Sequence, residues 1–530
     1  MERVAESRDR LLTATKDSRM PDDGYKPNNQ LPVVHKPMNE WPAIAAVPGR
    51  PVPELRGRDS AGWPRFPSAS QKISASVIVQ AFGIPLIAMV LRIASSGTAN
   101  ASYILVALYA MTGPRQAIVS LYLCWLFNMI NHGLAPAAGY AAILRHLVIL
   151  CAFISVMVHS KRGTSARTGI LVPATLVLCG FLIVHSMIFS HQSDISLLKA
   201  ISFSLTVTAL TVGWGTLEER ERQITMAFLF GSLGLIAVIS IPFVTSTIGY
   251  FKNGRGFQGV LVHPQNFGPT MAVLAALLVG QGLTEKKLRF WKVFLLGLSI
   301  LWIFLSQARI GGLAFVLSLV LGIGCNAIMT WMERNPSRNP LRLGRLTWAT
   351  VLVLIAGIAA APFVGTQVST FIQKGARSES LSDIAMASRG GKINEMMVNI
   401  RQYPIFGTGF GVLLGSDYFT IQRDPILGLP IMATVEKGVM PVAIVEETGI
   451  VGACITFPWL LLVLVRSVRG GLISGIVFWS VLATNIAEAC FFSPGGQGMF
   501  QLIFAIWAAT SPQASVIQPV VLQRRQRHAA

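Results

Sequence analysis

The sequence predicts an all-α polytopic membrane protein, and three observations support this prediction. Hydrophobic residues make up 52% of the 530 residues, while charged residues make up only 13%, about half the charged fraction of a typical soluble domain. The mean hydropathy is +0.56. Long apolar runs recur from about residue 73 to residue 511. This composition excludes a soluble globular enzyme, a disordered chain and a disulfide scaffold.

The two ends of the chain differ from the apolar region between them. Residues 1–72 contain many prolines and mixed charge, without an apolar period, which predicts a disordered cytoplasmic tail. Residues 73–511 form the predicted transmembrane domain. Residues 512–530 end in a basic segment and are predicted to form a cytoplasmic C-terminal tail.

The apolar runs predict about fourteen transmembrane helices, with twelve as the lower count. A helix that crosses the hydrocarbon core needs roughly 17–25 apolar residues, and the second, third and last predicted spans are shorter than this. The predicted spans are 75–92, 99–112, 117–131, 141–159, 170–190, 196–215, 226–245, 267–283, 291–306, 311–331, 347–365, 440–465, 471–492 and 498–511.

The basic residues test this count and assign the two sides. The net charge of +20 would suggest nucleic acid in a soluble protein, but here it predicts inside-facing anchors and no nucleic-acid partner. With the tail inside, nearly all short basic loops fall in the cytoplasm, as the positive-inside rule requires. Both termini are then cytoplasmic, and the chain is predicted to be a multi-pass protein of a bacterial inner membrane.

Two long segments fall on the outer face, at about 246–266 and 366–439. The second is too long for a simple connection and is predicted to be a functional periplasmic loop. Any chemistry is therefore expected at or just above the outer membrane surface.

Several cations lie on this outer face, which should be poor in them, and three arginines are the most informative of them. Arg255 lies in a glycine-rich segment, Arg309 lies in a very short turn between two apolar spans, and Arg389 lies in the large loop. Arginine at membrane depth usually faces a partner or a wet cavity, and its planar fork fits phosphate oxygens. The three arginines predict a polyanion site, with a lipid-linked pyrophosphate as the candidate ligand. The alternative for each is a solvated residue that contacts lipid headgroups.

His263 and Pro264 precede the predicted span 267–283, with Asn266 near a cap position. His263 could act as a base or bind a hydroxyl group. The equally weighted alternative is a residue that caps backbone groups where the helix begins.

Residues 388–411 predict a short amphipathic helix that runs into a glycine turn at Gly407, Gly409 and Gly411. Glycine allows positive φ and a close approach of the backbone to a ligand. The strand and helix that flank a dinucleotide fingerprint are missing, so dinucleotide binding is rejected.

Glutamates occur just before and within the predicted span 440–465, at Glu436, Glu446 and Glu447. Adjacent residues point about 100° apart on a helix, so Glu446 and Glu447 are not expected to share one face. At least one is expected to point into the helix bundle towards a partner such as an arginine. A general base, a site for a cation and a purely structural ion pair all remain open. The six cysteines share no metal-ligand spacing and are predicted to be small buried residues.

Together, these segments resemble the O-antigen ligase and O-antigen polymerase superfamily of bacterial envelope glycosyltransferases. They occur in the order of that family and cover roughly residues 225–465. The matching pieces are the loop Arg255–Gly268, the serine–arginine element Ser306–Arg309, Arg389 followed by Pro404 and the glycine turn, and Glu447-Thr448-Gly449.

The resemblance implies a metal-independent, inverting glycosyltransferase of the membrane-embedded C type that needs no cofactor. Such an enzyme transfers a glycan from undecaprenyl diphosphate to an acceptor sugar hydroxyl at the periplasmic face. Arg255, Arg309 and Arg389 would bind the diphosphate, and a base would deprotonate the acceptor. The implied partners are the lipid-linked glycan, the acceptor glycan and the bilayer, with a chain-length regulator and a flippase as further partners.

The sequence departs from the family pattern at two places. Ligases in particular have a histidine shortly before the Glu-x-Gly element, where this chain has Glu436-Lys437-Gly438, and the usual serine before the short-loop arginine is Ala308. The base is therefore expected among Glu436, Glu447 and His263. The missing histidine favours a polymerase for exopolysaccharide or O-antigen over a ligase that acts on lipid A–core or protein.

A flippase for the lipid-linked unit is the alternative from another class. Such a transporter should contain internal repeats, whereas this sequence has no evident repeat and carries its outer cations in the second half. A purely structural scaffold is the least favoured alternative.

Overall fold

The computed structural model describes residues 82–136, 138–160, 168–252, 254–285, 289–332, 381–412, 414, 421–423, 430–433, 437–486 and 488–511, with backbone alone for 381–389, 421–422 and 430–433. All of these residues belong to one compact unit, Ala61–Ala530. The predicted tails 1–72 and 512–530 and the predicted span 347–365 lie outside the described residues.

Each of the remaining thirteen predicted span ranges contains a helix. These helices are α2 (Ile84–Ala94), α3 (Ser96–Ala110), α4 (Pro114–Met129), α5 (Ala141–His159), α7 (Leu171–Ile188), α8 (Ser193–Thr216), α9 (Glu219–Ile239), α10 (Pro264–Thr284), α11 (Phe290–Leu305), α12 (Arg309–Met332), α15 (Met440–Arg469), α16 (Leu472–Thr484) and α17 (Gln497–Ala509). The 3₁₀ helix η3 (Ile241–Thr245) follows α9 within the predicted span 226–245. The two long outer segments contain the 3₁₀ helix η4 (Thr247–Tyr250), the helix α14 (Leu381–Gln402) and an antiparallel ribbon of β1 (Ile421–Arg423) and β2 (Pro430–Ala433).

Seven of the described helices are long and apolar enough to cross a membrane. The chain is therefore an α-helical, multi-pass membrane protein. The seven are α5, α7, α8, α9 together with η3, α10, α12 and α15. The other helices in predicted span ranges have 11 to 16 residues, shorter than the roughly 17 needed for an untilted crossing.

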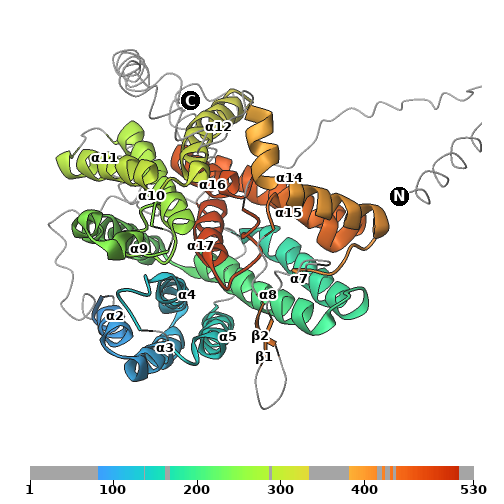
Figure 1. Cartoon of the computed structure of the whole chain (residues 1–530), viewed down its shortest axis with the longest axis horizontal. Coiled ribbons are helices and arrows are strands. Elements are labelled where there is room, and N and C mark those ends of the chain that lie inside the picture. Colours follow the sequence, from blue (N-terminus) through green and yellow to red (C-terminus); the bar gives the residue numbers. More distant parts are fainter. Residues whose placement is uncertain are drawn as a thin grey trace, which may run out of the picture. The chain divides into compact units, whose positions relative to one another are not determined.

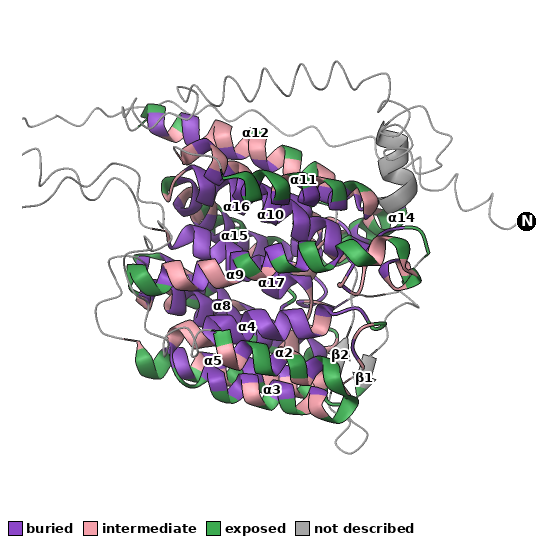
Figure 2. Ribbon diagram, turned by 90° about the vertical axis from the view of Figure 1, so that its left-hand side faces the viewer, coloured by how far each residue is buried: buried purple, intermediate pink, exposed green. Residues whose placement is uncertain are grey.

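Helix α17 lies in the middle of the bundle, between α4, α8, α15 and α16 (Figure 1). All thirteen of its residues are buried. Its sequence is apolar on every side, and a helix of this kind has to be surrounded by other helices or by lipid. Figure 2 shows the same pattern, with buried residues concentrated on α17 and its neighbours and exposed residues on outer helices such as α3.

Two arginines bind the carboxyl end of α17. The Arg222 guanidinium donates to the Trp507 carbonyl and to the Thr510 hydroxyl, and Arg466 Nε donates to the Ala509 carbonyl at 3.1 Å. The last carbonyls of a helix lack intrahelical donors and carry partial negative charge, so these cations stabilise the helix end. We call this side of the bundle the Arg222 end, and the opposite side the Arg255 end.

Candidate functional site

Helix α15 is broken at Gly449, which has φ 64° and ψ −169°. The break frees backbone groups on both sides of the glycine, and the glycine turn 403–411 satisfies them. Carbonyls before the break accept from the turn, and amides after it donate to the turn. These hydrogen bonds join Thr408 N–H to Glu446 O (2.9 Å), Gly409 N–H to Glu447 O (2.9 Å), Ile450 N–H to Pro404 O (3.0 Å) and Val451 N–H to Ile405 O (3.3 Å).

A helix that runs into the glycine turn is confirmed, but it is not short, because α14 has 22 residues and begins at Leu381, before the predicted residue 388. All three glycines of the turn have positive φ, at 71° for Gly407, 118° for Gly409 and 68° for Gly411. A Cβ atom on Gly407 would lie 2.5 Å from the Glu446 carbonyl oxygen. The alternate glycines therefore allow the turn to lie directly against the broken helix.

The break presents both adjacent glutamates to one lysine. Lys437 Nζ lies 2.8 Å from Glu446 Oε2 and 3.1 Å from Glu447 Oε1. The exposed fraction of the side chain is 2% for Lys437, 0% for Glu446 and 14% for Glu447. The prediction that at least one glutamate points into the bundle is confirmed by Glu446. The expected divergence does not keep the two carboxylates apart, because Lys437 lies three residues before α15 and its ammonium reaches both.

Three further groups complete this cluster. Asn399 Nδ2 of α14 donates to Glu446 Oε1 at 2.8 Å, and Gly411 N–H donates to Glu447 Oε2 at 2.8 Å. Lys199 Nζ of α8 donates to the Gly411 carbonyl at 2.6 Å. Lys199, Lys437, Glu446 and Glu447 thus form a charge-balanced group, which we call the Lys437 cluster. Such balance is needed where charges are removed from water.

Aromatic and histidine side chains of the α7–α8 connection hold the turn from the other side. The rings of Phe189 and Phe406 stack at 3.9 Å with an angle of 4°. His185 Nε2 lies 2.6 Å from the Phe406 carbonyl oxygen, and the His191 amide N–H donates to the Thr408 carbonyl at 3.2 Å. The turn is therefore fixed between the break in α15 and the end of α7.

The segments that carry Arg255, His263 and Arg309 lie against one another. Phe257 N–H donates to the Leu305 carbonyl at 2.9 Å. A Cβ atom on Gly256 would lie 2.7 Å from the Ser306 carbonyl oxygen and 3.0 Å from Pro264 Cβ. Arg255 is exposed on its loop, and Arg309 is the half-buried first residue of α12. The structure thus brings together three of the sequence-predicted segments.

His263 caps the amino end of α10. Its Nδ1 accepts from the Gln265 amide at 3.0 Å, and Pro264 occupies the first turn of the helix. With Nδ1 accepting, a neutral ring carries its proton on Nε2 and presents a donor there. The capping interpretation of His263 therefore agrees with this geometry.

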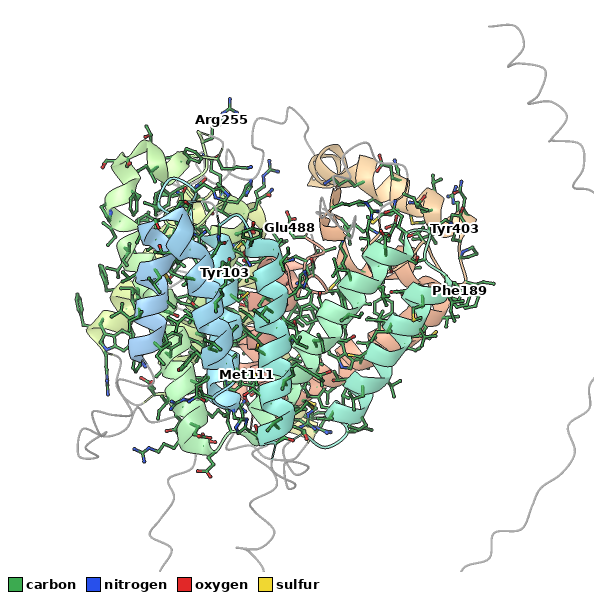
Figure 3. The ribbon with its side chains drawn as sticks, turned by 90° about the horizontal axis from the view of Figure 1, so that it is seen from below. Tyr103, Met111, Phe189, Arg255, Tyr403 and Glu488 are labelled. Carbon is green, nitrogen blue, oxygen red and sulfur yellow. The ribbon has the colours of Figure 1, made fainter. Side chains whose placement is uncertain are left out.

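The Lys437 cluster and the segments that carry Arg255, His263 and Arg309 all lie at the Arg255 end of the bundle. Figure 3 shows Arg255, Glu488 and Tyr403 towards one end of the bundle and Met111 towards the other. The segment 488–497 connects the Lys437 cluster with α10, because Ala489 N–H donates to the Lys437 carbonyl at 3.1 Å and Gln497 Nε2 donates to Thr270 Oγ1 of α10 at 3.1 Å.

The side chains of two predicted site residues lie outside the part of the chain that the structure describes. Glu436 lies outside the described residues, and Arg389 lies on α14 with its side chain outside them. Sequence reasoning missed Lys199 and Asn399 and gave Lys437 no role. Lys199 did leave a signal, since it is the one charged residue within the predicted span 196–215, and ionisable residues inside apolar spans usually mark function or a partner. Asn399 left none.

In comparisons of the chain with models of protein families, with curated proteins and with solved structures, no match was found.

Proposed function

We propose that this chain is a polysaccharide polymerase of the membrane-embedded C type of glycosyltransferase, with fourteen membrane spans and a large periplasmic loop. It would transfer an undecaprenyl-diphosphate-linked glycan to an acceptor sugar hydroxyl. One observation supports the proposal most directly. The partly exposed carboxylate of Glu447 is held between Lys437 and the Gly411 amide of the glycine turn, and Tyr403 of that turn lies towards the same end of the bundle as Arg255.

The distribution of basic residues supports a periplasmic position for that site. Basic residues lie in or beside the short connections between helices at the Arg222 end, which we assign to the cytoplasm because short cytoplasmic loops are rich in lysine and arginine. The Arg255 end then faces the periplasm of a bacterial inner membrane, with both termini cytoplasmic. The residues concerned are Arg115, Arg220, Arg222, Arg289, Arg466 and Arg469.

The arginines would bind the donor. Arg255 and Arg309 project from adjoining segments, and Arg389 lies on the helix that leads to the glycine turn. Guanidinium forks bind phosphate oxygens in pairs, so these residues would hold the diphosphate and stabilise the negative charge that grows on it as the glycosidic bond breaks.

Glu447 would receive the acceptor. A carboxylate offers about four acceptor positions. The Gly411 amide occupies one on Oε2, and Lys437 Nζ lies 3.1 Å from Oε1 as an ion-pair partner. The remaining positions would bind the acceptor hydroxyl. Its oxygen attacks the anomeric carbon, the bond from that carbon to the diphosphate oxygen breaks with inversion, and the hydroxyl proton passes to Glu447. Glu436 and His263 remain the other candidate bases, although His263 in its capping geometry presents a hydrogen-bond donor at Nε2 and has no free nitrogen lone pair to take up a proton.

Deletion of the gene, followed by analysis of the lipid-linked intermediates, tests this function. Loss of a polymerase is expected to leave single repeat units on the carrier at the outer face of the membrane. Long chains on the carrier would instead indicate a ligase, and single units confined to the inner face would indicate a flippase. Either of these two results would refute the proposed reaction.

Arg309→Lys is expected to lower polymer synthesis about 100-fold or more while the protein still inserts, because lysine keeps the charge but cannot form the forked contact. The measurement is polymer length and amount in the deletion strain complemented with each variant at equal protein level. Arg469→Lys, on an exposed arginine at the Arg222 end, is the matched control and should restore normal polymer. Full activity of Arg309→Lys would contradict the proposed role of this arginine.

A further inference from the structure

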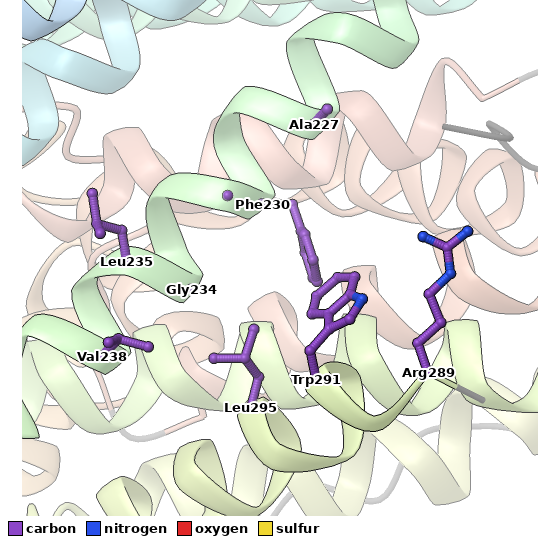
Figure 4. Close-up of a pocket in the computed structure, with 9 residues that line it drawn as sticks. Ala227, Phe230, Gly234, Leu235, Val238, Arg289, Trp291 and Leu295 are labelled. Atoms are coloured by element: carbon purple, nitrogen blue, oxygen red, sulfur yellow. The ribbon is translucent and has the colours of Figure 1, made fainter. Parts of the chain in front are cut away.

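An apolar groove lies between α9 and α11, two helices that contribute no residue to the Lys437 cluster. It has a volume of about 470 Å³, and Arg289 is the one charged side chain among the residues that line it (Figure 4). The other lining residues are apolar and include Phe230, Leu235 and Trp291.

Two glycines of α9 create the groove. A Cβ atom on Gly231 would meet no other atom within 4 Å, so a side chain there would project into open space. A Cβ atom on Gly234, less than one helical turn further on, would lie 3.2 Å from Leu295 Cδ1 of α11. The two helices therefore approach closely at Gly234, and the space at Gly231 is left by the missing side chain.

The length of the groove along α9 matches the thickness of one membrane leaflet. Its lining on α9 extends from Ala227 to Val238, and eleven residues of helix rise about 16 Å. Half of a hydrocarbon core is about 15 Å. The rim is exposed and apolar, with Leu235 57% and Val238 41% accessible, as expected for a surface that lipid chains cover.

The end of the groove at the amino terminus of α11 is positive. Arg289 is the N-cap residue of α11 and is exposed, so its charge adds to the partial positive charge of the helix end. Within the described residues, Arg289 has no ion-pair partner, whereas the neighbouring Lys292 is neutralised by Glu285. Trp291, beside Arg289, is the residue type that favours the level of the lipid headgroups.

We propose that this groove binds one acyl chain of an anionic phospholipid from the leaflet at the Arg222 end, with the lipid headgroup at Arg289. The apolar walls accept the chain, the length matches one leaflet, and Arg289, the one cation among the lining residues, lies where the headgroup would be. This site is at the opposite end of the bundle from the proposed transferase site, so neither proposal depends on the other.

Native mass spectrometry of the full chain tests the inference. The protein is equilibrated in micelles that contain equal amounts of dioleoyl-phosphatidylglycerol and dioleoyl-phosphatidylcholine. The wild-type chain is expected to retain one lipid, with about a fivefold preference for phosphatidylglycerol, the effect typical of one basic residue at a membrane surface. Gly231→Leu, which fills the groove, is expected to remove the retained lipid. Gly180→Leu, at an exposed α7 glycine whose Cβ would also meet open space, is the matched control and should retain it.

A second variant separates the headgroup from the chain. Arg289→Gln is expected to keep a bound lipid but to lower the preference to near unity, while Arg469→Gln should leave the preference unchanged. Equal lipid retention by Gly231→Leu and Gly180→Leu would overturn the proposal, as would an unchanged preference in Arg289→Gln. A wild-type chain that retains no lipid and appears as a dimer would show that a second copy covers the groove, and this too would overturn it.

Discussion

Replacing Lys437 with methionine is expected to destabilise the protein by about 3–5 kcal/mol, the cost typical of removing one partner from a buried ion pair. The substitution leaves Glu446, whose side chain is fully buried, and Glu447 without the ammonium that lies 2.8 and 3.1 Å from them. Methionine has a similar length and is apolar, so lost packing contributes little. The effect therefore reports the two uncompensated carboxylates.

The free energy of unfolding in mixed micelles, compared between wild type and variant, measures this effect. Arg423→Met is the control, because Arg423 and Asp194 form an exposed ion pair at 2.7 Å whose side chains are 46% and 40% accessible. Pairs of this kind contribute about 0–1 kcal/mol. Equally small losses of unfolding free energy in the two variants would show that Lys437 does not neutralise the two carboxylates of the Lys437 cluster.

Gly449→Ala is expected to destabilise the protein by about 2–6 kcal/mol. A positive φ costs about 1–3 kcal/mol in a residue with a side chain, and forcing an extra methyl group into a packed site costs about 1–3 kcal/mol more. At Gly449 both apply, since φ is 64° and the added Cβ would overlap the Ile405 carbonyl. The expected consequence is that the glycine turn separates from α15 and that activity is lost together with stability.

Unfolding of Gly449→Ala can be compared with that of Gly180→Ala in the same micelles. Gly180 lies on α7 with open space around its Cβ position, so alanine there is expected to stabilise by about 0.4–1 kcal/mol. If Gly449→Ala also stabilised the protein, α15 would be a continuous helix and the hydrogen bonds to the turn would have to be reassigned.

The sequence is sufficient to locate the helices because long apolar segments leave few alternatives. Thirteen predicted span ranges contain a helix, and the glycine turn was found from alternate glycines that need positive φ. The span count is harder to predict. Helices such as α16 and α17, with 13 residues each, are as apolar as spans but too short for an untilted crossing, and apolar composition alone does not separate a buried core helix from a membrane helix.

The Lys437 cluster could be predicted only in part. Carboxylates in an apolar span need partners, so the sequence points to Glu446 and Glu447, but an arginine is only one example of such a partner and the structure shows Lys437 in that place. The break at Gly449 determines which groups meet, and a glycine within a helix does not by itself predict a break. Asn399 and Lys199 come from α14 and α8, at large sequence separations that no local pattern encodes.

The proposed reaction is tested most directly with the purified chain and its own substrate. Lipid-linked single units, extracted from the deletion strain, are supplied in vesicles that contain wild-type protein or Glu447→Gln. The account predicts that wild type converts them into carrier-linked multiples with release of undecaprenyl diphosphate, and that Glu447→Gln, which retains the shape of the side chain but not its charge, does so at least about 100-fold more slowly. Units that stay single with the wild-type chain, or equal rates with both proteins, would contradict it.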